Sequence, residues 1–392
     1  MARRTGALIA LAVCVLVSGI ALAACGGGSS TGGSETSASS EGGSSSVSSA
    51  DLARYERELE EAYEGTYTPP QGEPFKPPSG KNIWVVSVGQ QSEGTAETAE
   101  IISEVGPKLG WKVTVFDGKF EPNRWQEGIE QAIAAKADGI ALLYIDCAPV
   151  KSALEQAKKA GIPVVATENK DCNPSLLTNI TFSNGETFLE KNEKAWGKFQ
   201  ADYVIGKTKG ETKVITTEET DLETTKAMAA GAKKQLEACP TCEIVEEIKF
   251  VGTELGPPLQ QKIEQALNQN PEANAFIGNY DTVLTSGGAA ALRASGRLGE
   301  IAVVGGEGTA EGLELIWDES GSDACVGYDQ AWTGYALIDL LGRSFAGKSL
   351  QGVDSGLGVQ LCDKEHNLPP KGTSFVAPIK YVPLYEKMWG LK

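Results

Sequence analysis

The feature that most constrains this chain is a regular alternation of short apolar runs and longer helical segments. Apolar runs of strand length begin near residues 83, 111, 139 and 162, so they recur every 23 to 28 residues. Segments rich in alanine, lysine and glutamate separate them, such as NRWQEGIEQAIAAKA and PVKSALEQAKKA. Strand, helix and strand in this order build a parallel sheet through right-handed crossovers, with helices covering both faces.

The same alternation starts again in the second half of the chain. Strands are expected near residues 213, 244, 275, 301 and 324, and helices over 224–237, 258–268, 281–294 and 309–317. A chain of 392 residues can bury two cores of ordinary domain size. The sequence therefore predicts an α/β fold with two doubly wound parallel-sheet lobes.

The first 25 residues do not belong to these lobes. Arg3 and Arg4 precede an apolar run over residues 7–24, which ends in Leu-Ala-Ala before Cys25. This pattern is typical of an export signal. The alternatives are a transmembrane anchor, for which the span is short, and an ordinary cleaved signal. The end of the run resembles the lipobox of bacterial lipoproteins, which implies that the Cys25 thiol carries a diacylglycerol.

Residues 26–80 connect the signal to the first lobe. Residues 26–50 are almost entirely Gly, Ser, Thr, Ala and Glu, a composition typical of a flexible, disordered linker. Residues 51–64 have apolar positions at helical spacing, and we expect this helix to pack on the surface of a lobe. The proline-rich segment TPPQGEPFKPPSG follows and completes an N-terminal helix and strap over 51–80.

The balance of charge excludes one class of partner. The formal net charge is -17 at pH 7. Nucleic-acid binding needs a concentrated lysine and arginine surface that releases counterions from phosphates. We therefore expect no nucleic-acid partner, while the acidic balance by itself names no ligand.

Six cysteines remain after Cys14, in the signal, and Cys25 are set aside. In an exported protein, six cysteines suggest three disulfide bonds, for which the sequence alone permits fifteen pairings. Cys147 and Cys172 lie just beyond the ends of neighbouring predicted strands. A disulfide between these adjacent loops has the required separation.

The motif Cys239-Pro-Thr-Cys242 joins the end of a predicted helix to the next strand. A redox centre of this spacing would follow a strand, and a zinc site would need two further ligands at suitable spacing. A local disulfide is therefore favoured, and no metal is expected. Cys325 and Cys362 then pair by elimination.

The predicted strands end in polar, acidic and aromatic residues. In open parallel sheets, ligands bind beyond the carboxyl ends of the strands. We therefore expect these ends to face one another across a cleft between the lobes. The candidate ligand-binding residues at these ends are Gln90, Gln91, Ser92, Asp146, Glu168 and Asn169 in the first lobe, and Glu254, Tyr280, Asp281 and Glu307 in the second.

Four segments occur in an informative order, namely IDCAPV, GIPVVATEN, NPEANAFIGNYDTV and IAVVGGEGTAEG. Their order and spacing resemble the ribose-binding-like, type I periplasmic binding proteins of bacterial ABC importers, from about residue 81 to residue 345. The resemblance implies three crossings between the lobes, near Ser183, Gly327 and Gly356. The lobes would then comprise residues 81–182 with 328–356, and residues 183–327 with 357–392.

The resemblance also implies a ligand pocket. The family's acid after the fourth strand corresponds to Glu168, with Asn169 beside it, and the acid in its Gly-Phe-Asp-Gly turn corresponds to Glu307. Three pocket positions of the family, an arginine, an asparagine and a glutamine, are occupied here by Lys226, by Tyr280 ahead of Asp281, and by Tyr328. The segment GQQSEGT lacks the aromatic residues that sugar-binding members have after their first strand.

The expected pocket favours a sugar or polyol, with a cationic amine as the alternative. Carboxylates accept hydrogen bonds from hydroxyl groups, and tyrosine rings offer apolar faces. An amine would be attracted by several carboxylates with only Lys226 as counter-charge, and by the tyrosines through cation–π interactions. Some of the acids have a competing structural role as caps of helix N-termini.

Two catalytic interpretations are disfavoured. Glycoside hydrolysis needs two acids at a fixed separation, whereas Glu168 and Glu307 would lie on lobes that move. Residues 342–349, GRSFAGKS, fit the phosphate-binding pattern GxxxxGK[ST]. That loop must follow a strand, but a helical run precedes it, so Gly347 is expected to end a helix. We expect no enzyme activity and no cofactor.

These observations predict a substrate-binding protein that closes two lobes over a small polar solute and delivers it to an ABC permease. We expect an extracytoplasmic monomer, anchored to the outer face of the cell membrane only through lipidated Cys25. A tethered sensor that engages a signalling receptor would have the same binding domain and is the alternative of a different class.

Overall fold

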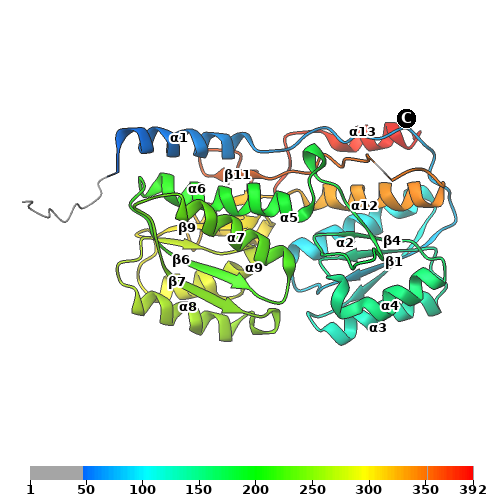
Figure 1. Ribbon diagram of the computed structural model, residues 1–392, viewed down its shortest axis with the longest axis horizontal. Coiled ribbons are helices and arrows are strands. Elements are labelled where there is room, and N and C mark those ends of the chain that lie inside the picture. The colour runs from blue at the N-terminus through cyan, green and yellow to red at the C-terminus, as the bar shows by residue number, and fades with distance from the viewer. Residues whose placement is uncertain (1–46, 351, 392) are drawn as a thin grey trace, which may run out of the picture. The chain divides into compact units, whose positions relative to one another are not determined.

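The computed structural model describes residues 47–350 and 352–391, so the expected export signal, Cys25 and most of the linker lie outside the described residues. Two sheets organise this part of the chain (Figure 1). Their strand orders are β2-β1-β3-β4-β5 and β11-β10-β9-β8-β6-β7. The prediction of an α/β fold with two sheet-based lobes is confirmed. Over residues 47–350 and 352–391, no helix has the length and apolar character needed to cross a membrane.

The first sheet consists of five parallel strands between two pairs of helices. The strands are β1 (Asn82–Ser87), β2 (Lys112–Asp117), β3 (Gly139–Leu143), β4 (Val164–Thr167) and β5 (Thr178–Asn179). Helices α3 (Pro122–Ala134) and α4 (Cys147–Lys159) pack together on one face, and α2 (Glu93–Val105) and α12 (Gln330–Phe345) on the other (Figure 1). Every residue of β3 and β4 is buried, as expected for central strands covered on both faces.

The second sheet has six strands. They are β6 (Lys213–Glu219), β7 (Glu243–Phe250), β8 (Ala275–Ile277), β9 (Ala302–Glu307), β10 (Ala324–Gly327) and β11 (Gln360–Asp363). The five strands β6 to β10 are parallel to one another, and β11 is antiparallel to β10. Neither β11 nor β5 was expected. A strand of two residues such as β5 is too short to show a periodic pattern, and β11 is antiparallel to β10 and lies outside the alternation of parallel strands and helices.

Several helices cover the second sheet. They are α5 (Phe188–Lys191), α6 (Gly197–Lys207), α7 (Glu223–Glu237), α8 (Pro257–Gln269), α9 (Asp281–Val283), α10 (Ala289–Ala294) and α11 (Ala310–Trp317). Single turns of π-helix, η3 (Asn192–Trp196) and η5 (Leu284–Gly288), join α5 to α6 and α9 to α10. The 3-10 turns are η1 (Gly106–Leu109), η2 (Ser183–Gly185) and η4 (Gly252–Glu254). The helices expected over 224–237, 258–268 and 309–317 agree with α7, α8 and α11 to within one residue.

The segment from α5 to α6 was missed by the sequence analysis. Residues 199–205 of α6 are all buried, so this helix has no polar stripe of its own. Sequence periodicity detects a helix through the contrast between an apolar and a polar face. A helix that is covered on every side lacks that contrast.

Three disulfide bonds join the pairs that were predicted, Cys147–Cys172, Cys239–Cys242 and Cys325–Cys362. The first links the start of α4 to the loop after β4. The last joins β10 to β11, where the two cysteines lie directly opposite each other in the antiparallel register.

The chain passes between the two sheets three times, after β5, after β10 and before β11. The first and third crossings lie side by side near the expected positions. The Ser183 N–H donates to the Leu357 carbonyl at 2.8 Å, and the Ser355 N–H donates to the Thr181 carbonyl at 2.9 Å. This arrangement confirms a hinge with three crossings.

The proline-rich strap forms a further connection beside the third crossing. The N–H groups of Thr66 and Thr68 donate to the carbonyls of Val359 and Gly356 at 2.9 and 3.0 Å. Gly356 has a φ of +73°, and a Cβ atom there would lie 2.0 Å from the Thr68 carbonyl oxygen. Only glycine permits this close approach.

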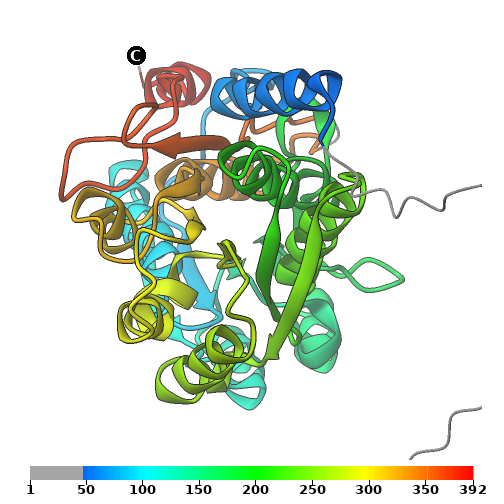
Figure 2. The same cartoon turned by 90° about the vertical axis from the view of Figure 1, so that its left-hand side faces the viewer.

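The N-terminal segment contacts both lobes. Helix α1 (Ser49–Glu64) packs on α6 and β11 of the second lobe, which confirms the helix and its surface position (Figure 2). At the other end of the strap, Trp111 Nε1 in the first lobe donates to the Pro78 carbonyl at 2.7 Å. The strap therefore bridges the lobes in addition to the three crossings.

The C-terminal helix α13 (Tyr381–Met388) packs on α12, which covers the first sheet. Trp389, directly after α13, donates from Nε1 to Asp339 Oδ1 at 2.8 Å. The expected boundary at residue 357 placed this helix with the second lobe. The structure differs because only β11, at the start of that segment, pairs with the second sheet.

The residues that fit a phosphate-binding pattern follow a helix, as expected. Helix α12 ends at Phe345, and Gly347 then adopts a φ of +63°. The Gly347 N–H donates to the Ser344 carbonyl at 3.2 Å. The loop therefore terminates α12 and does not connect a strand to a helix.

Helix α7 and the segment from η3 to α6 approach each other backbone to backbone. A Cβ atom on Gly231, in α7, would lie 2.3 Å from the Glu193 carbonyl oxygen. A Cβ atom on Gly197 would lie 1.9 Å from the Met228 carbonyl oxygen. Because both obstacles are backbone atoms, side-chain rotation cannot relieve the clash.

We predict that Gly231→Ala destabilises the protein by about 1–3 kcal/mol, because the helices must move apart. The intrinsic helix preference of alanine would by itself have stabilised α7. Urea unfolding followed by circular dichroism measures the change. Lys233→Ala, at an exposed position of the same helix, is the control and should be near neutral. Equal stability of Gly231→Ala and this control would contradict the close approach.

Candidate functional site

A small cavity lies between the two lobes at the carboxyl ends of their strands. Its volume is about 30 Å³, which is room for about two water molecules. Both lobes contribute to its lining, which consists of Val88, Ser92, Thr95, Phe120, Tyr144 and Glu168 from the first and Trp196, Leu222, Thr224, Thr225, Met228, Tyr280 and Glu307 from the second. Glu168 and Glu307, the two acids singled out in the sequence, therefore line one shared cavity.

Three of the lining residues have a left-handed backbone at the end of a strand. Tyr144 follows β3 with a φ of +60°, Glu168 follows β4 with a φ of +53°, and Glu307 ends β9 with a φ of +79°. This conformation is uncommon for residues other than glycine and is found at sites where the surrounding structure imposes it. At these three positions the strand stops and the chain turns at the cavity wall.

The Glu168 carboxylate is held by three side chains of the second lobe. Its Oε2 accepts hydrogen bonds from Asn192 Nδ2 and Thr224 Oγ1, both at 2.7 Å. Its Oε1 forms an ion pair with Lys191 Nζ. Glu168 is 2 % exposed and Lys191 is 0 % exposed. The acid predicted to bind ligand therefore also joins the lobes.

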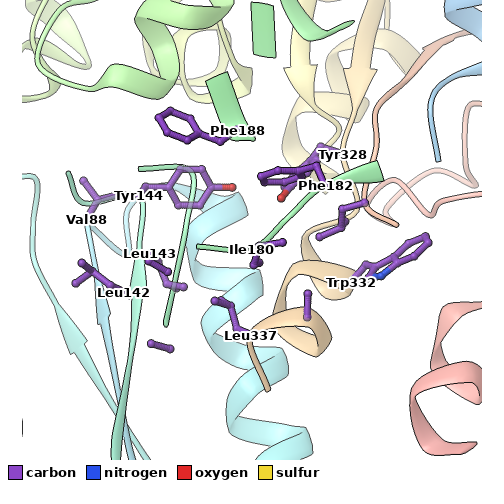
Figure 3. Packing of buried hydrophobic residues seen from close by; sticks show 14 of the residues in the cluster. Val88, Leu142, Leu143, Tyr144, Ile180, Phe182, Phe188, Tyr328, Trp332 and Leu337 are labelled. Atoms are coloured by element: carbon purple, nitrogen blue, oxygen red, sulfur yellow. The ribbon is translucent and has the colours of Figure 1, made fainter. Parts of the chain in front are cut away.

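Lys191, the last residue of α5, has aromatic rings on three sides of its ammonium group. Nζ lies 4.3 Å from the ring centroid of Tyr328, 4.6 Å from that of Phe182 and 5.1 Å from that of Trp196. Figure 3 shows the rings of Phe182 and Tyr328 next to each other, with Tyr144 across from them. Burial lowers the pKa of Lys191, and Glu168 opposes that shift.

Glu307 is the other acid of the cavity, and its environment differs from that of Glu168. Burial raises its pKa well above the usual carboxyl range, and the nearby acids Asp281 and Glu93 add to the shift. Within the described part of the chain, its Oε2 atom has no hydrogen-bond partner, and the same holds for Nε2 of Gln330. A Cβ atom on Gly94 would lie 2.9 Å from Glu307 Oε1 and 2.6 Å from Gln330 Nε2.

Tyr280 lines the cavity and is fixed by a third acid. Its hydroxyl donates to Glu219 Oε2 at 2.5 Å. Burial raises the pKa of Glu219 to about 8, and the neighbouring Asp221 contributes in the same direction. The hydrogen bond from Tyr280 acts the opposite way.

Two of the predicted binding residues serve as structural acceptors instead. Asp281 is buried and accepts from the Thr309 N–H at 2.7 Å and the Gly306 N–H at 3.2 Å, so it fixes the turn after β9. Burial raises its pKa to about 7. Asp146 accepts from the Glu223 N–H at 3.0 Å, at the start of α7. Asp146 therefore has the capping role that was expected to compete with ligand binding, whereas Asp281 accepts from a strand and a turn.

Other predicted residues lie away from the cavity lining. Lys226 pairs with Glu223 at 2.8 Å, and Glu254 pairs with Lys262 at 2.8 Å, both on the surface. The prediction of Lys226 as the counter-charge of the pocket is wrong in this structure, because Lys191 occupies that role. The remaining predicted residues outside the lining are Gln90, Gln91, Asn169 and Tyr328, of which Gln91 is exposed and Tyr328 packs over Lys191.

The segment after β1 has no aromatic residue, but Phe120, which follows β2, lines the cavity. Phe120, after β2, lies against Gly89, where a Cβ atom would be 2.5 Å from the Phe120 ring. Phe120 and Tyr144 both follow strands, so the rule used for the acids applies to them too. Lys191, Asn192 and Trp196 were missed because no element was predicted there. Among the described residues, no group of three or more His, Cys, Asp or Glu side chains is arranged to hold a metal ion.

Comparison with known proteins identifies the family of this chain. A family model for the periplasmic binding protein domain matches residues 83–349. None of the curated protein sequences matches the chain.

Solved structures share the fold at low sequence identity. An ABC sugar transporter subunit from Rhodobacter sphaeroides is 20 % identical with a TM-score of 0.63, over 74 % of this chain and 99 % of that one. A solute-binding protein from Bacillus halodurans with bound myo-inositol is 18 % identical with a TM-score of 0.63, over 73 % and 96 %. A 5-methylthioribose transporter solute-binding protein from Thermotoga lettingae is 19 % identical with a TM-score of 0.65, over 75 % and 89 %.

The family match covers more than half of the chain, and the two lobes, the three crossings and the shared cavity agree with it. This chain therefore belongs to the periplasmic binding proteins and has their ribose-binding-like, type I fold.

Proposed function

We propose that this protein is the extracytoplasmic substrate-binding protein of an ABC importer and that it captures a sugar or polyol by closing its two lobes. The observation that supports this most directly is the single cavity lined by Glu168 from one lobe and Glu307 from the other. A solute that contacts both lobes stabilises the closed arrangement over the open one.

The unpartnered polar atoms suit the hydroxyl groups of such a solute. Glu307 Oε2 and Gln330 Nε2 are buried, and the side chains that carry them both lie against Gly94. A hydroxyl group both donates and accepts, so neighbouring hydroxyls can satisfy the two atoms at once. The rings of Phe120, Trp196 and Tyr280 add the apolar faces on which sugar rings pack.

The charge state of the cavity favours an uncharged ligand. Glu168 is already paired with Lys191. The raised pKa of Glu307 favours its protonated, neutral form. The amine alternative relied on several carboxylates with only Lys226 as counter-charge, whereas Lys191 is paired with Glu168 at the cavity wall.

The cavity volume supports a mechanism with opening and closing. About 30 Å³ is far below the roughly 300–1,000 Å³ of ligand pockets. The lobes therefore have to separate for a sugar to enter. When they close around it, they remain further apart than in this structure.

The proposed anchor is a lipid on Cys25 at the outer face of the membrane. Its support is the lipobox-like sequence and the flexible composition of residues 26–50. The described chain continues from this linker into α1, which packs on the second lobe. A monomer on such a tether would reach its permease within the membrane plane.

A thermal-shift panel of sugars, polyols, amines and amino acids tests the function. We expect a sugar or polyol to raise the melting temperature, since ligand at one hundred times its Kd adds about 2.7 kcal/mol of stability. Binding of the identified ligand should be nearly independent of salt, because a neutral solute is not screened. A shift confined to amines, with strong salt dependence, would overturn the proposed ligand class.

We predict that Glu307→Ala weakens binding of the identified ligand by roughly 5- to 100-fold, the effect of one lost hydrogen bond to a buried polar group. Glutamine would keep an acceptor and a donor at this position and would therefore resemble the protonated form of Glu307. Isothermal titration calorimetry measures the Kd. Glu311→Ala, at an exposed acid on α11, is the control and should bind as the wild type does. Unchanged affinity in Glu307→Ala would remove Glu307 from the binding site.

We predict that Gly94→Ala preserves the fold but weakens binding by at least about 5-fold. The new methyl group meets the ends of two side chains, Glu307 and Gln330, which must shift. Gln330 Oε1 accepts hydrogen bonds from the hydroxyls of Thr98 at 2.9 Å and Tyr144 at 3.1 Å, so we also expect a modest loss of stability. Their displacement removes two groups from the ligand. Glu100→Ala, on the exposed face of the same helix, is the control. Wild-type affinity in Gly94→Ala would show that neither side chain contacts the ligand.

We predict that the ligand-free protein loses stability as the pH rises from about 4.5 to about 8, partly through Glu219. The folded state holds the Glu219 proton more tightly than the unfolded chain does, so its contribution is largest below the unfolded pKa and disappears above the folded pKa. Melting temperatures from pH 5 to pH 9 should therefore fall less steeply in Glu219→Gln. The exposed Glu237→Gln is the control, and an identical slope in all three proteins would contradict the burial of a protonated Glu219.

A further inference from the structure

The Lys191 ammonium group occupies a cage made of three rings and one carboxylate. Tyr328, Phe182 and Trp196 have ring centroids 4.3 to 5.1 Å from Nζ, and Glu168 forms an ion pair with it. Aromatic faces around a carboxylate are the surroundings in which proteins hold a ligand ammonium group. Here the cation comes from the protein itself.

This cage is part of the proposed binding site. Glu168 and Trp196 line the cavity, and both contact Lys191 from that wall. Phe182 lies at the first crossing between the lobes, and Tyr328 follows β10 at the second. The cage is therefore assembled only when both lobes and their hinge are in this arrangement.

We infer that Lys191 is a specificity-determining residue, an internal cation that fills the place of a ligand ammonium group and restricts the site to uncharged solutes. This inference deepens the proposed function and rests on it. Both carboxylate oxygens of Glu168 already have partners, which are Lys191, Asn192 and Thr224. A second cation would find no unpaired carboxylate there and would be repelled by Lys191.

The inference predicts that removing the internal cation creates a site for an external one. Lys191→Ala deletes three methylene groups and the ammonium group, which together match n-propylammonium. We expect n-propylammonium chloride at neutral pH to raise the melting temperature of Lys191→Ala in a saturable manner, by at least about 2 °C. The wild type should show no saturable shift, because its cage is full.

Two controls separate charge from volume. 1-Propanol has nearly the same shape as n-propylammonium without the charge, and it should not rescue Lys191→Ala. In the double variant Lys191→Ala/Glu168→Gln, the carboxylate is neutral, and the response to n-propylammonium should be lost. Equal rescue by 1-propanol, or an undiminished response in the double variant, would show that the cavity binds apolar groups only and would overturn the inference.

Lys191→Ala leaves Glu168 buried without its counter-charge, so this variant is expected to be less stable than the double variant. If it is too unstable to purify folded, refolding from urea with n-propylammonium, with 1-propanol and with sodium chloride at equal concentration gives the same comparison. Refolding promoted by n-propylammonium alone supports the cage. Equal yields in the three solutions would contradict it.

The experiment uses no sugar, so its result tests the role of Lys191 separately from the proposed function. Absence of any sugar or polyol shift in the wild type, together with rescue by n-propylammonium, would retain the internal cation and reject the ligand class. Sugar binding without rescue would retain the function and reject the role of Lys191.

Discussion

The buried ion pair between Glu168 and Lys191 is the interaction on which the site depends. It joins the end of a first-lobe strand to a helix of the second lobe, and both side chains are removed from water. Removing one partner of such a pair by mutation costs about 3–5 kcal/mol, far more than the loss of a surface pair, because the other charge stays buried without compensation. Asn192 and Thr224 donate two further hydrogen bonds to the same carboxylate. All three partners of Glu168 belong to the second lobe, so these contacts exist only while the lobes are together.

The two lobes are connected by more than the three crossings of the chain. Three crossings belong to the type I fold, and the first and third are hydrogen-bonded to each other. The strap is a fourth segment of chain between the lobes. It is hydrogen-bonded to the third crossing and has contacts on both lobes. Gly356 permits this close approach, so the strap lies directly against the third crossing. The proposed lipid tether enters through this same segment.

The cavity combines two acids in different electrical surroundings. Glu168 has a lysine as partner, whereas Glu307 faces other acids and has its pKa raised by burial. Neither therefore presents an unpaired negative charge to a ligand. This distribution supports the proposal of a neutral solute even though the chain has a net charge of -17.

The sequence by itself determined the two lobes and the position of Glu168 and Glu307 at strand ends, and the predicted order of strands then selected three disulfide pairs among the fifteen possible pairings. The reason is that parallel strands with helical crossovers impose a regular local pattern, and that pattern places every strand end at one edge. The buried helix α6 and the two-residue strand β5 were not predicted, because they have no such pattern. Only the tertiary structure decided that Asp146 and Asp281 accept backbone hydrogen bonds while Lys191, and not Lys226, balances Glu168. Which buried charges become partners depends on distances between segments far apart in the chain, and no local pattern in the sequence encodes those distances.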